Sequence, residues 1–171
     1  MKDVLLTAAI LLGACSSTVP GTVLKLASVD PLTADPADIA LQASLPDGVG
    51  LLPRAGTLAL RAELRDGSEK SGAFPVERVG DVLRVAPASH DALRALQADI
   101  AAWEQADPDG TTGSLDVDLE PCRRGADIPD EATLSVAIRL EAEGAFLPLI
   151  RDAKVVDLVD SDTIAAMPLC P

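Results

Sequence analysis

From residue 58 to residue 65 the chain reads LALRAELR, and this stretch decides the fold class. Every second residue is apolar, and most of the residues between them are charged. Because successive side chains of a strand point to opposite faces, this pattern predicts a β-strand with one buried and one solvated face. The residues of the predicted buried face are Leu58, Leu60, Ala62 and Leu64.

The same alternation recurs at residues 39–45, 115–120 and 134–140. Segments 74–78 and 81–86 are predicted to form a further hairpin. Turn-forming residues separate the segments, as in Pro46-Asp47-Gly48 and Arg65-Asp66-Gly67-Ser68, where glycine tolerates a positive φ and aspartate bonds its own backbone. The chain is therefore predicted to be mainly β.

One amphipathic helix is predicted at about residues 90–106. Its apolar residues recur at spacings of three and four, Ser89 is the expected N-cap, and Asp107-Pro108 ends it. The apolar stripe is Leu93, Leu96, Ile100 and Trp103. We expect an antiparallel sandwich or half-barrel of about 7–8 strands, with this helix covering one end or edge.

Three further segments are less regular. Residues 22–26 are interpreted as a first strand, and 30–36 as a loop. Residues 146–150 are apolar but contain Pro148, which favours an edge strand or a bend. Residues 152–160 fit either a short helix or a strand.

Composition bears on the partners. The chain has 171 residues and a formal net charge of −13, which repels nucleic acid and anionic headgroups. Aromatic residues are few, with no tyrosine, so stacking platforms for sugars or single strands are disfavoured. No cofactor and no metal are predicted.

The first residues have the layout of a secretory signal. Met1-Lys2-Asp3 precedes an apolar run at 4–12 and the small residues Gly13-Ala14. The run is about half of the roughly 20 apolar residues that a membrane-spanning helix needs, so it is interpreted as a signal and not as a permanent anchor.

The tetrapeptide Leu12-Gly13-Ala14-Cys15 resembles the lipobox of bacterial lipoproteins. The resemblance implies a signal peptide at 1–14 and a tether at 15–21 whose Cys15 carries diacylglyceryl. The length and the strand pattern of the remainder predict a single β-rich domain at 22–171. It also implies attachment to the envelope membrane through the lipid, with the domain in the periplasm. Ser16 follows the cysteine, which favours the outer membrane over the inner one. In the alternative interpretation Cys15 is an ordinary thiol, and the protein is free in the periplasm.

If Cys15 carries lipid, Cys122 and Cys170 remain as a pair in an oxidising compartment, where we expect a disulfide. It would close a loop of about 49 residues and stabilise the fold by roughly 4 kcal/mol. The alternative, a cysteine nucleophile, needs a nearby general base, and the chain contains one histidine, His90.

For two motifs we prefer a structural interpretation to a catalytic or metal-binding one. Ser89, His90 and Asp91 are adjacent in the first turn of the predicted helix and do not face one another, so they do not form a catalytic triad. Residues 105–116 have part of the spacing of a calcium loop but depart from it at Gln105, Thr112 and Asp116. A helix-ending loop is the preferred interpretation.

Asp116, Asp118 and Glu120 share one face of a predicted strand. Such a row is usually a solvated face, and the alternative is a docking stripe for a basic partner. Phe146 opens the apolar segment 146–150, which either packs on the core or forms a patch for a partner. Trp103 is a core anchor or, alternatively, a binding hot spot.

The leading hypothesis is a lipid-anchored, non-catalytic module that binds or scaffolds another envelope component. One alternative is a hydrolase that uses carboxylates such as Asp116 and Asp118 in a cleft. Another is a carrier of a small apolar ligand, which would require a large dry pocket.

Overall fold

The structure, a computed structural model, describes residues 30–125 and 127–171. The predicted signal peptide, the lipidated tether with Cys15 and the predicted strand at 22–26 lie outside these residues. The described residues form a seven-stranded antiparallel sheet. Its strands are β1 (Ala40–Ser44), β2 (Val49–Leu64), β3 (Glu69–Val79), β4 (Val82–Val85), β5 (Thr111–Arg123), β6 (Thr133–Arg139) and β7 (Leu147–Lys154).

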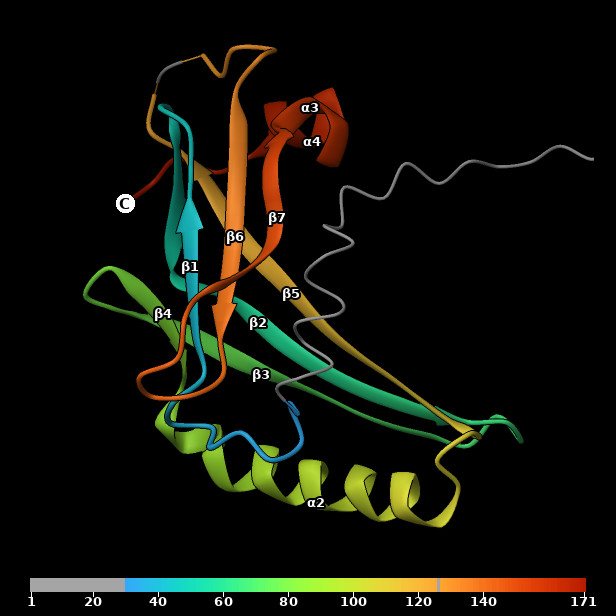
Figure 1. Ribbon diagram of the computed structural model, residues 1–171. Coiled ribbons are helices and arrows are strands. Elements are labelled where there is room, and N and C mark those ends of the chain that lie inside the picture. Colours follow the sequence, from blue (N-terminus) through green and yellow to red (C-terminus); the bar gives the residue numbers. More distant parts are fainter. Residues whose placement is uncertain (1–29, 126) are drawn as a thin grey trace, which may run out of the picture.

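The strand order across the sheet is β5-β2-β3-β4-β1-β6-β7, so β5 and β7 are the two outer strands. The sheet curls into a half-barrel (Figure 1), so that residues of β5 and β7 line one common pocket. The mainly β prediction is confirmed, and of its two architectures the half-barrel is the one formed. One curled sheet encloses the core, where a sandwich would need two.

The alternation at residues 58–64 makes the inner face of β2. Leu58 lies opposite Phe74 on β3 and opposite Val117 on β5, so apolar side chains of three strands meet on one side of the sheet. Leu58, Leu60 and Ala62 are buried, as predicted.

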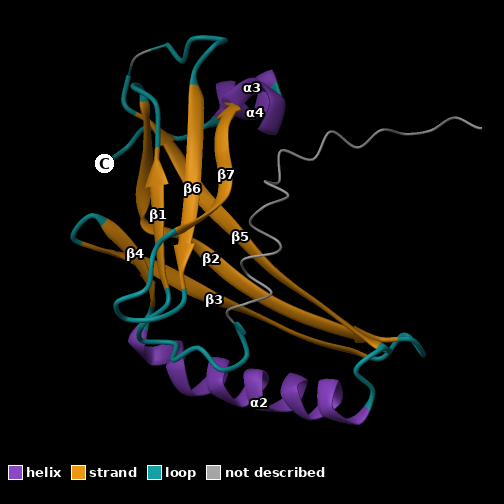
Figure 2. Cartoon of the chain, in the orientation of Figure 1, coloured by secondary structure: helices purple, strands orange, loops and turns teal. Residues whose placement is uncertain are grey.

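The predicted helix is α2 (His90–Ala106), and it closes one side of the half-barrel (Figure 2). Leu93 and Ile100 are each 1% exposed and belong to the same core as the strands. Ser89 occupies the N-cap position, but the prediction that it caps the helix is wrong for its side chain, which makes no capping hydrogen bond. A 3-10 turn, η1 (Pro87–Ser89), leads directly into the helix, and the backbone N–H of Ser89 donates to the oxygen of Ala86.

Strand β2 is longer than its alternating part because it contains a bulge. Between Leu51 and Gly56 it advances five residues, whereas β5 advances only two, from Pro121 to Leu119. Before the bulge, odd-numbered residues of β2 such as Val49 and Leu51 lie on the inner face. After the bulge, even-numbered residues such as Leu58 lie on that face. Gly56 has φ 144°, and a Cβ there would overlap the backbone oxygen of Asp118, so the close approach of β2 to β5 requires glycine.

The chain after β7 is helical. Strand β7 runs directly into α3 (Val155–Leu158), which is followed by α4 (Ser161–Ala166), and both lie beside the end of β7 (Figure 1). The segment 152–160 is thus partly strand and partly helix.

Candidate binding pocket

An apolar pocket of about 470 Å³ opens between the two outer strands of the half-barrel. It is lined from the inner face by β2, β5, β6 and β7, and at one end by α3 and Met167. All but two lining residues are aliphatic, methionine or proline. The lining residues are Leu45, Val49, Leu51, Leu115, Asp116, Val117, Asp118, Leu119, Pro121, Leu134, Val136, Leu149, Ile150, Val155, Leu158, Val159 and Met167.

Strand alternation positions the β5 side of the pocket. Leu115, Val117 and Leu119 pack against the core as partly buried residues, with their side chains on the inner face. Asp116 and Asp118 lie between them, so their side chains belong to the outer face and they border the pocket at its rim. The pocket therefore reaches the outer edge of β5.

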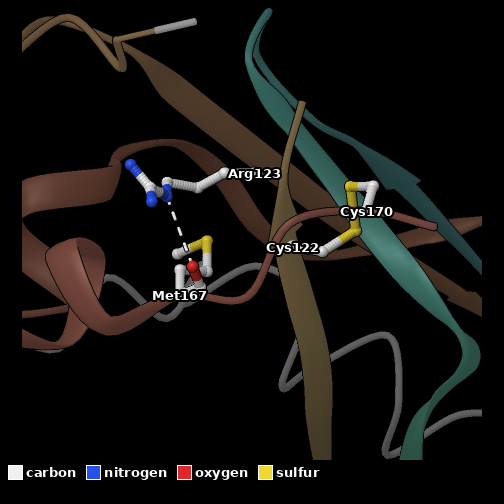
Figure 3. The surroundings of a disulfide bond; sticks show 4 residues. All are labelled: Cys122, Arg123, Met167 and Cys170. Atoms are coloured by element: carbon white, nitrogen blue, oxygen red, sulfur yellow. Dashed lines mark hydrogen bonds between the residues drawn. A yellow bond between two sulfur atoms is a disulfide. The ribbon is translucent and has the colours of Figure 1, made fainter. Parts of the chain in front are cut away.

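The C-terminal segment forms the end wall and joins it to β5. Cys122 and Cys170 form a disulfide with a Cα–Cα distance of 5.0 Å, which confirms the predicted pair (Figure 3). The backbone N–H of Arg123 donates to the oxygen of Pro168 (2.7 Å), and the N–H of Cys170 donates to the oxygen of Arg123 (2.8 Å). The chain leaving β7 is thereby bonded back to β5, so one end of the gap between the outer strands is closed.

The side chain of Arg123 supports the same wall. Its Nε donates to the backbone oxygen of Met167 at 3.3 Å (Figure 3). Met167 is 7% exposed and lines the pocket. One residue at the end of β5 thus holds the tail through both its backbone and its side chain.

The bonds of Arg123 also show which backbone groups of β5 face outward. In an antiparallel strand both polar groups of a residue point to the same side, and alternate residues point to opposite sides. Because Arg123 directs its N–H and C=O away from β2, those of Leu119, Val117 and Leu115 face the same outer edge. No strand of the described chain pairs with them there.

The outer edge of β7 is less regular. Its register against β6 shifts twice, Pro148 lacks an N–H, and Asp152 has a positive φ of 48°. At the irregularity the N–H of Asp152 donates to the Ser135 hydroxyl (2.9 Å) instead of to a backbone oxygen. Bulges and proline protect an edge strand from pairing with another chain, and the one proline of β5, Pro121, lies at its end beside the tail, so the part of β5 from Thr111 to Leu119 is the better template.

The acidic row lies where the alternation predicted. Asp116, Asp118 and Glu120 are exposed on the outer face of β5, and the residues opposite the first two on β2, Ala59 and Thr57, are uncharged. Ser114 donates a hydrogen bond to the Asp116 carboxylate (2.9 Å). Within residues 30–125 and 127–171, no Lys, Arg or His forms an ion pair with this row. Asp116 and Asp118 border the pocket only at its rim, with both side chains exposed on the outer face, so the geometry gives no support to a hydrolase built on this pair.

The other candidate residues have structural surroundings. Phe146 is half-buried just before β7, with the Arg139 guanidinium 5.1 Å from its ring centroid, and it does not line the pocket. The His90 ring lies 3.0 Å from the backbone oxygen of Val85. Trp103 packs partly buried against the core, with Lys70 Nζ 5.0 Å from its ring.

The calcium-loop alternative receives no support from the position of Asp116. Strand β5 begins at Thr111, and Asp116 pairs with Ala59 well inside the ladder. In the described part of the chain, no three His, Cys, Asp or Glu side chains are grouped to hold a metal ion.

The pKa of Asp160, at the start of α4, lies below its ordinary value because the carboxylate accepts hydrogen bonds from the backbone N–H and the hydroxyl of Thr163, both at 2.9 Å. Asp35 has a lowered pKa because the N–H of Ala37 donates to it and the Arg94 guanidinium lies 2.8 Å away. The N–H of Ser68 lowers the pKa of Asp66 in the same way.

Sequence reasoning missed the pocket as a unit. Its lining comes from four strands, α3 and Met167, and residues such as Val49 and Leu51 lie before the bulge that breaks the alternation of β2. The signal that was available was the apolar half of β5 together with the Cys122–Cys170 pair, which joins β5 to the C-terminal segment.

A scan against protein-family models, a search of curated proteins and a search of solved structures each gave no match to this chain. Among the described helices, none is both long and apolar enough to cross a membrane.

Proposed function

We propose that the protein is a lipid-anchored lipoprotein of the bacterial envelope, and that it is a non-catalytic binding module which holds an apolar part of another envelope component in the β5–β7 pocket. The observation that carries the binding role is the character of the pocket. Its walls are almost entirely aliphatic, it is open to solvent between two outer strands, and one end wall is fixed by a disulfide. Such walls favour apolar groups by removing their surface from water.

The anchoring role is supported by the order of the first residues. A short apolar run followed by Leu12-Gly13-Ala14-Cys15 is similar to the processing site of lipoproteins. Two or more acyl chains hold a protein firmly at a membrane, so the domain itself needs no spanning helix. The outer membrane with the domain in the periplasm is the proposed location.

The anchoring proposal is tested by intact mass and membrane partitioning in a Gram-negative host. We expect the wild type to begin at Cys15, to gain the mass of two or three acyl chains and to fractionate with membranes, whereas Cys15→Ala is not acylated. A soluble, unacylated wild type would overturn this part of the proposal.

The binding proposal is tested with a neutral fluorescent probe, N-phenyl-1-naphthylamine, added to the Cys15→Ala chain so that no detergent competes. Two residues of α3 give a matched pair: Leu158 is 39% exposed and lines the pocket, whereas Val156 is 41% exposed and does not. Leu158→Glu should abolish most of the probe fluorescence, and Val156→Glu should leave it unchanged. Equal fluorescence in both variants would show that the pocket does not bind apolar groups.

A second candidate function is transport of a small apolar ligand, which the pocket volume favours. About 470 Å³ lies within the range of about 300–1,000 Å³ that small-molecule sites occupy. Mass spectrometry of an organic extract of the purified protein distinguishes the two roles. A stoichiometric small molecule that is absent from Leu158→Glu would favour the carrier over the binding module.

A further inference from the structure

The outer edge of β5 is a long and regular row of backbone donors and acceptors. Strand β5 runs from Thr111 to Arg123, and its register against β2 is continuous from Thr111 to Leu119. An exposed edge of this kind binds extended segments as an added strand. The protein already uses this edge once, since the tail forms a parallel bridge between Leu169 and Arg123.

A strand added along this edge would have two different faces. Its inward side chains would enter the apolar pocket beside Leu115, Val117 and Leu119. Its outward side chains would lie next to Asp116, Asp118 and Glu120, because neighbouring strands place residues of the same face about 5 Å apart. The matching sequence therefore alternates apolar residues with lysine or arginine.

The acidic row also argues against a second copy of this chain as the occupant. If two β5 edges paired, the carboxylates of one copy would lie beside those of the other. Like charges that face each other across strands are destabilising, and with a net charge of −13 the whole chain repels its copies.

We propose that the β5 edge binds an extended partner segment in which apolar and basic residues alternate, the apolar ones filling the β5–β7 pocket and the basic ones pairing with Asp116, Asp118 and Glu120. This inference rests on the proposed binding function and specifies the chemistry of the partner. Backbone pairing at Leu115–Leu119 supplies the docking geometry, and charge supplies the selection.

The test uses the full Cys15→Ala chain and three synthetic peptides: one with alternating valine and lysine, one with the same residues in two blocks, and one with glutamate in place of lysine. We expect the alternating valine–lysine peptide to bind, to displace N-phenyl-1-naphthylamine and to weaken as salt rises. The peptide with its residues in two blocks and the peptide with glutamate in place of lysine should bind far more weakly.

A charge exchange gives the matched control. Asp116→Lys with Asp118→Lys should weaken the valine–lysine peptide about tenfold and strengthen the valine–glutamate peptide. Because both side chains are exposed on the outer face, these substitutions should not disturb the core.

The outcomes separate the two proposals. If the probe binds, Leu158→Glu abolishes its binding and no alternating peptide displaces the probe, then strand addition is wrong, while the proposal of an apolar binding pocket is supported. If the peptide with valine and lysine in two blocks binds as well as the alternating peptide, charge alone explains the binding, and the inference is overturned. Concentration-dependent dimers that prevent peptide binding would also overturn the inference. If the peptide binds only after Leu24→Asp with Leu26→Asp, residues 22–26 of the chain itself are the occupant, and the inference is again wrong.

Discussion

Gln97, 3% exposed in the middle of α2, donates a hydrogen bond from Nε2 to the backbone oxygen of Pro31 at 2.7 Å. The same amide nitrogen also donates to the oxygen of Ala34 (3.0 Å). A loop before β1 is thereby bonded to the helix that covers the core. Buried backbone oxygens are costly to leave without a donor, so this side chain, together with the Arg94–Asp35 ion pair, holds the two elements together.

Gln97→Leu should therefore lower the free energy of unfolding by about 1–3 kcal/mol, although leucine is the more apolar residue. Urea denaturation followed by circular dichroism measures the change. Gln105→Leu, an exposed position on the same helix, is the control and should change stability little. If the two variants are equally stable, the loop does not depend on the amide.

Removal of the disulfide should destabilise the whole domain. For a loop of about 49 residues, Cys122→Ala with Cys170→Ala should cost roughly 4 kcal/mol of unfolding free energy. The pocket should also lose affinity for N-phenyl-1-naphthylamine, because the tail that carries Met167 is no longer covalently bonded to β5. Reduction of the protein that keeps both cysteines should reproduce both effects, and unchanged probe binding after reduction would show that the end wall stands without the bond.

Substitution of Leu58 tests how much the buried core contributes to the free energy of unfolding. It is 0% exposed at the point where β2 lies between β3 and β5, so Leu58→Ala should cost about 2–5 kcal/mol through lost burial and the cavity that remains. Val79→Ala, at a position that is 49% exposed, should cost much less. A difference in the midpoint of urea unfolding at constant slope would assign the effect to stability.

Asp160 gives a pH dependence with a defined sign. Its pKa is lowered from 3.8 because Thr163 donates to the carboxylate, so the charged form is favoured in the folded state. The resulting stabilisation is present at pH above the unfolded pKa and is lost as the pH falls through the lower, folded pKa. Asp160→Asn still offers an oxygen to Thr163 but does not titrate.

Between about pH 6 and about pH 2, wild type should therefore lose more stability than Asp160→Asn. Asp162→Asn, on the same helix but without a bond to Thr163, is the control and should follow the wild type. Thermal unfolding across this range measures the three curves, and parallel curves for wild type and Asp160→Asn would contradict the assignment.

The parts of this fold that could be predicted from sequence are those governed by local periodicity. The alternation at 58–64 and 115–120 and the spacing of Leu93 and Ile100 predicted their elements correctly, because burial on one face follows directly from strand and helix geometry. The disulfide was also predicted, on the expectation that Cys15 carries lipid and leaves Cys122 and Cys170 as a pair.

What depends on distant contacts was not predictable. The buried role of Gln97 requires the loop at 31–34 to reach the helix, and nothing local in the sequence indicates this. The first part of β2 was missed because its bulge breaks the period. The pocket requires β5 and β7, which are adjacent neither in sequence nor in the sheet order, to curl toward each other.

The bridge between the tail and Arg123 gives the β5 edge a fixed end. A segment added to this edge, as proposed, would meet the residues around Leu169 and would extend only toward Thr111. From Thr111 to Pro121 a strand spans roughly 34 Å, at about 3.4 Å per residue. If a segment adds to this edge as proposed, the tail would act as a stop that fixes where the segment begins, and the protein's own chain would then set the register of the partner.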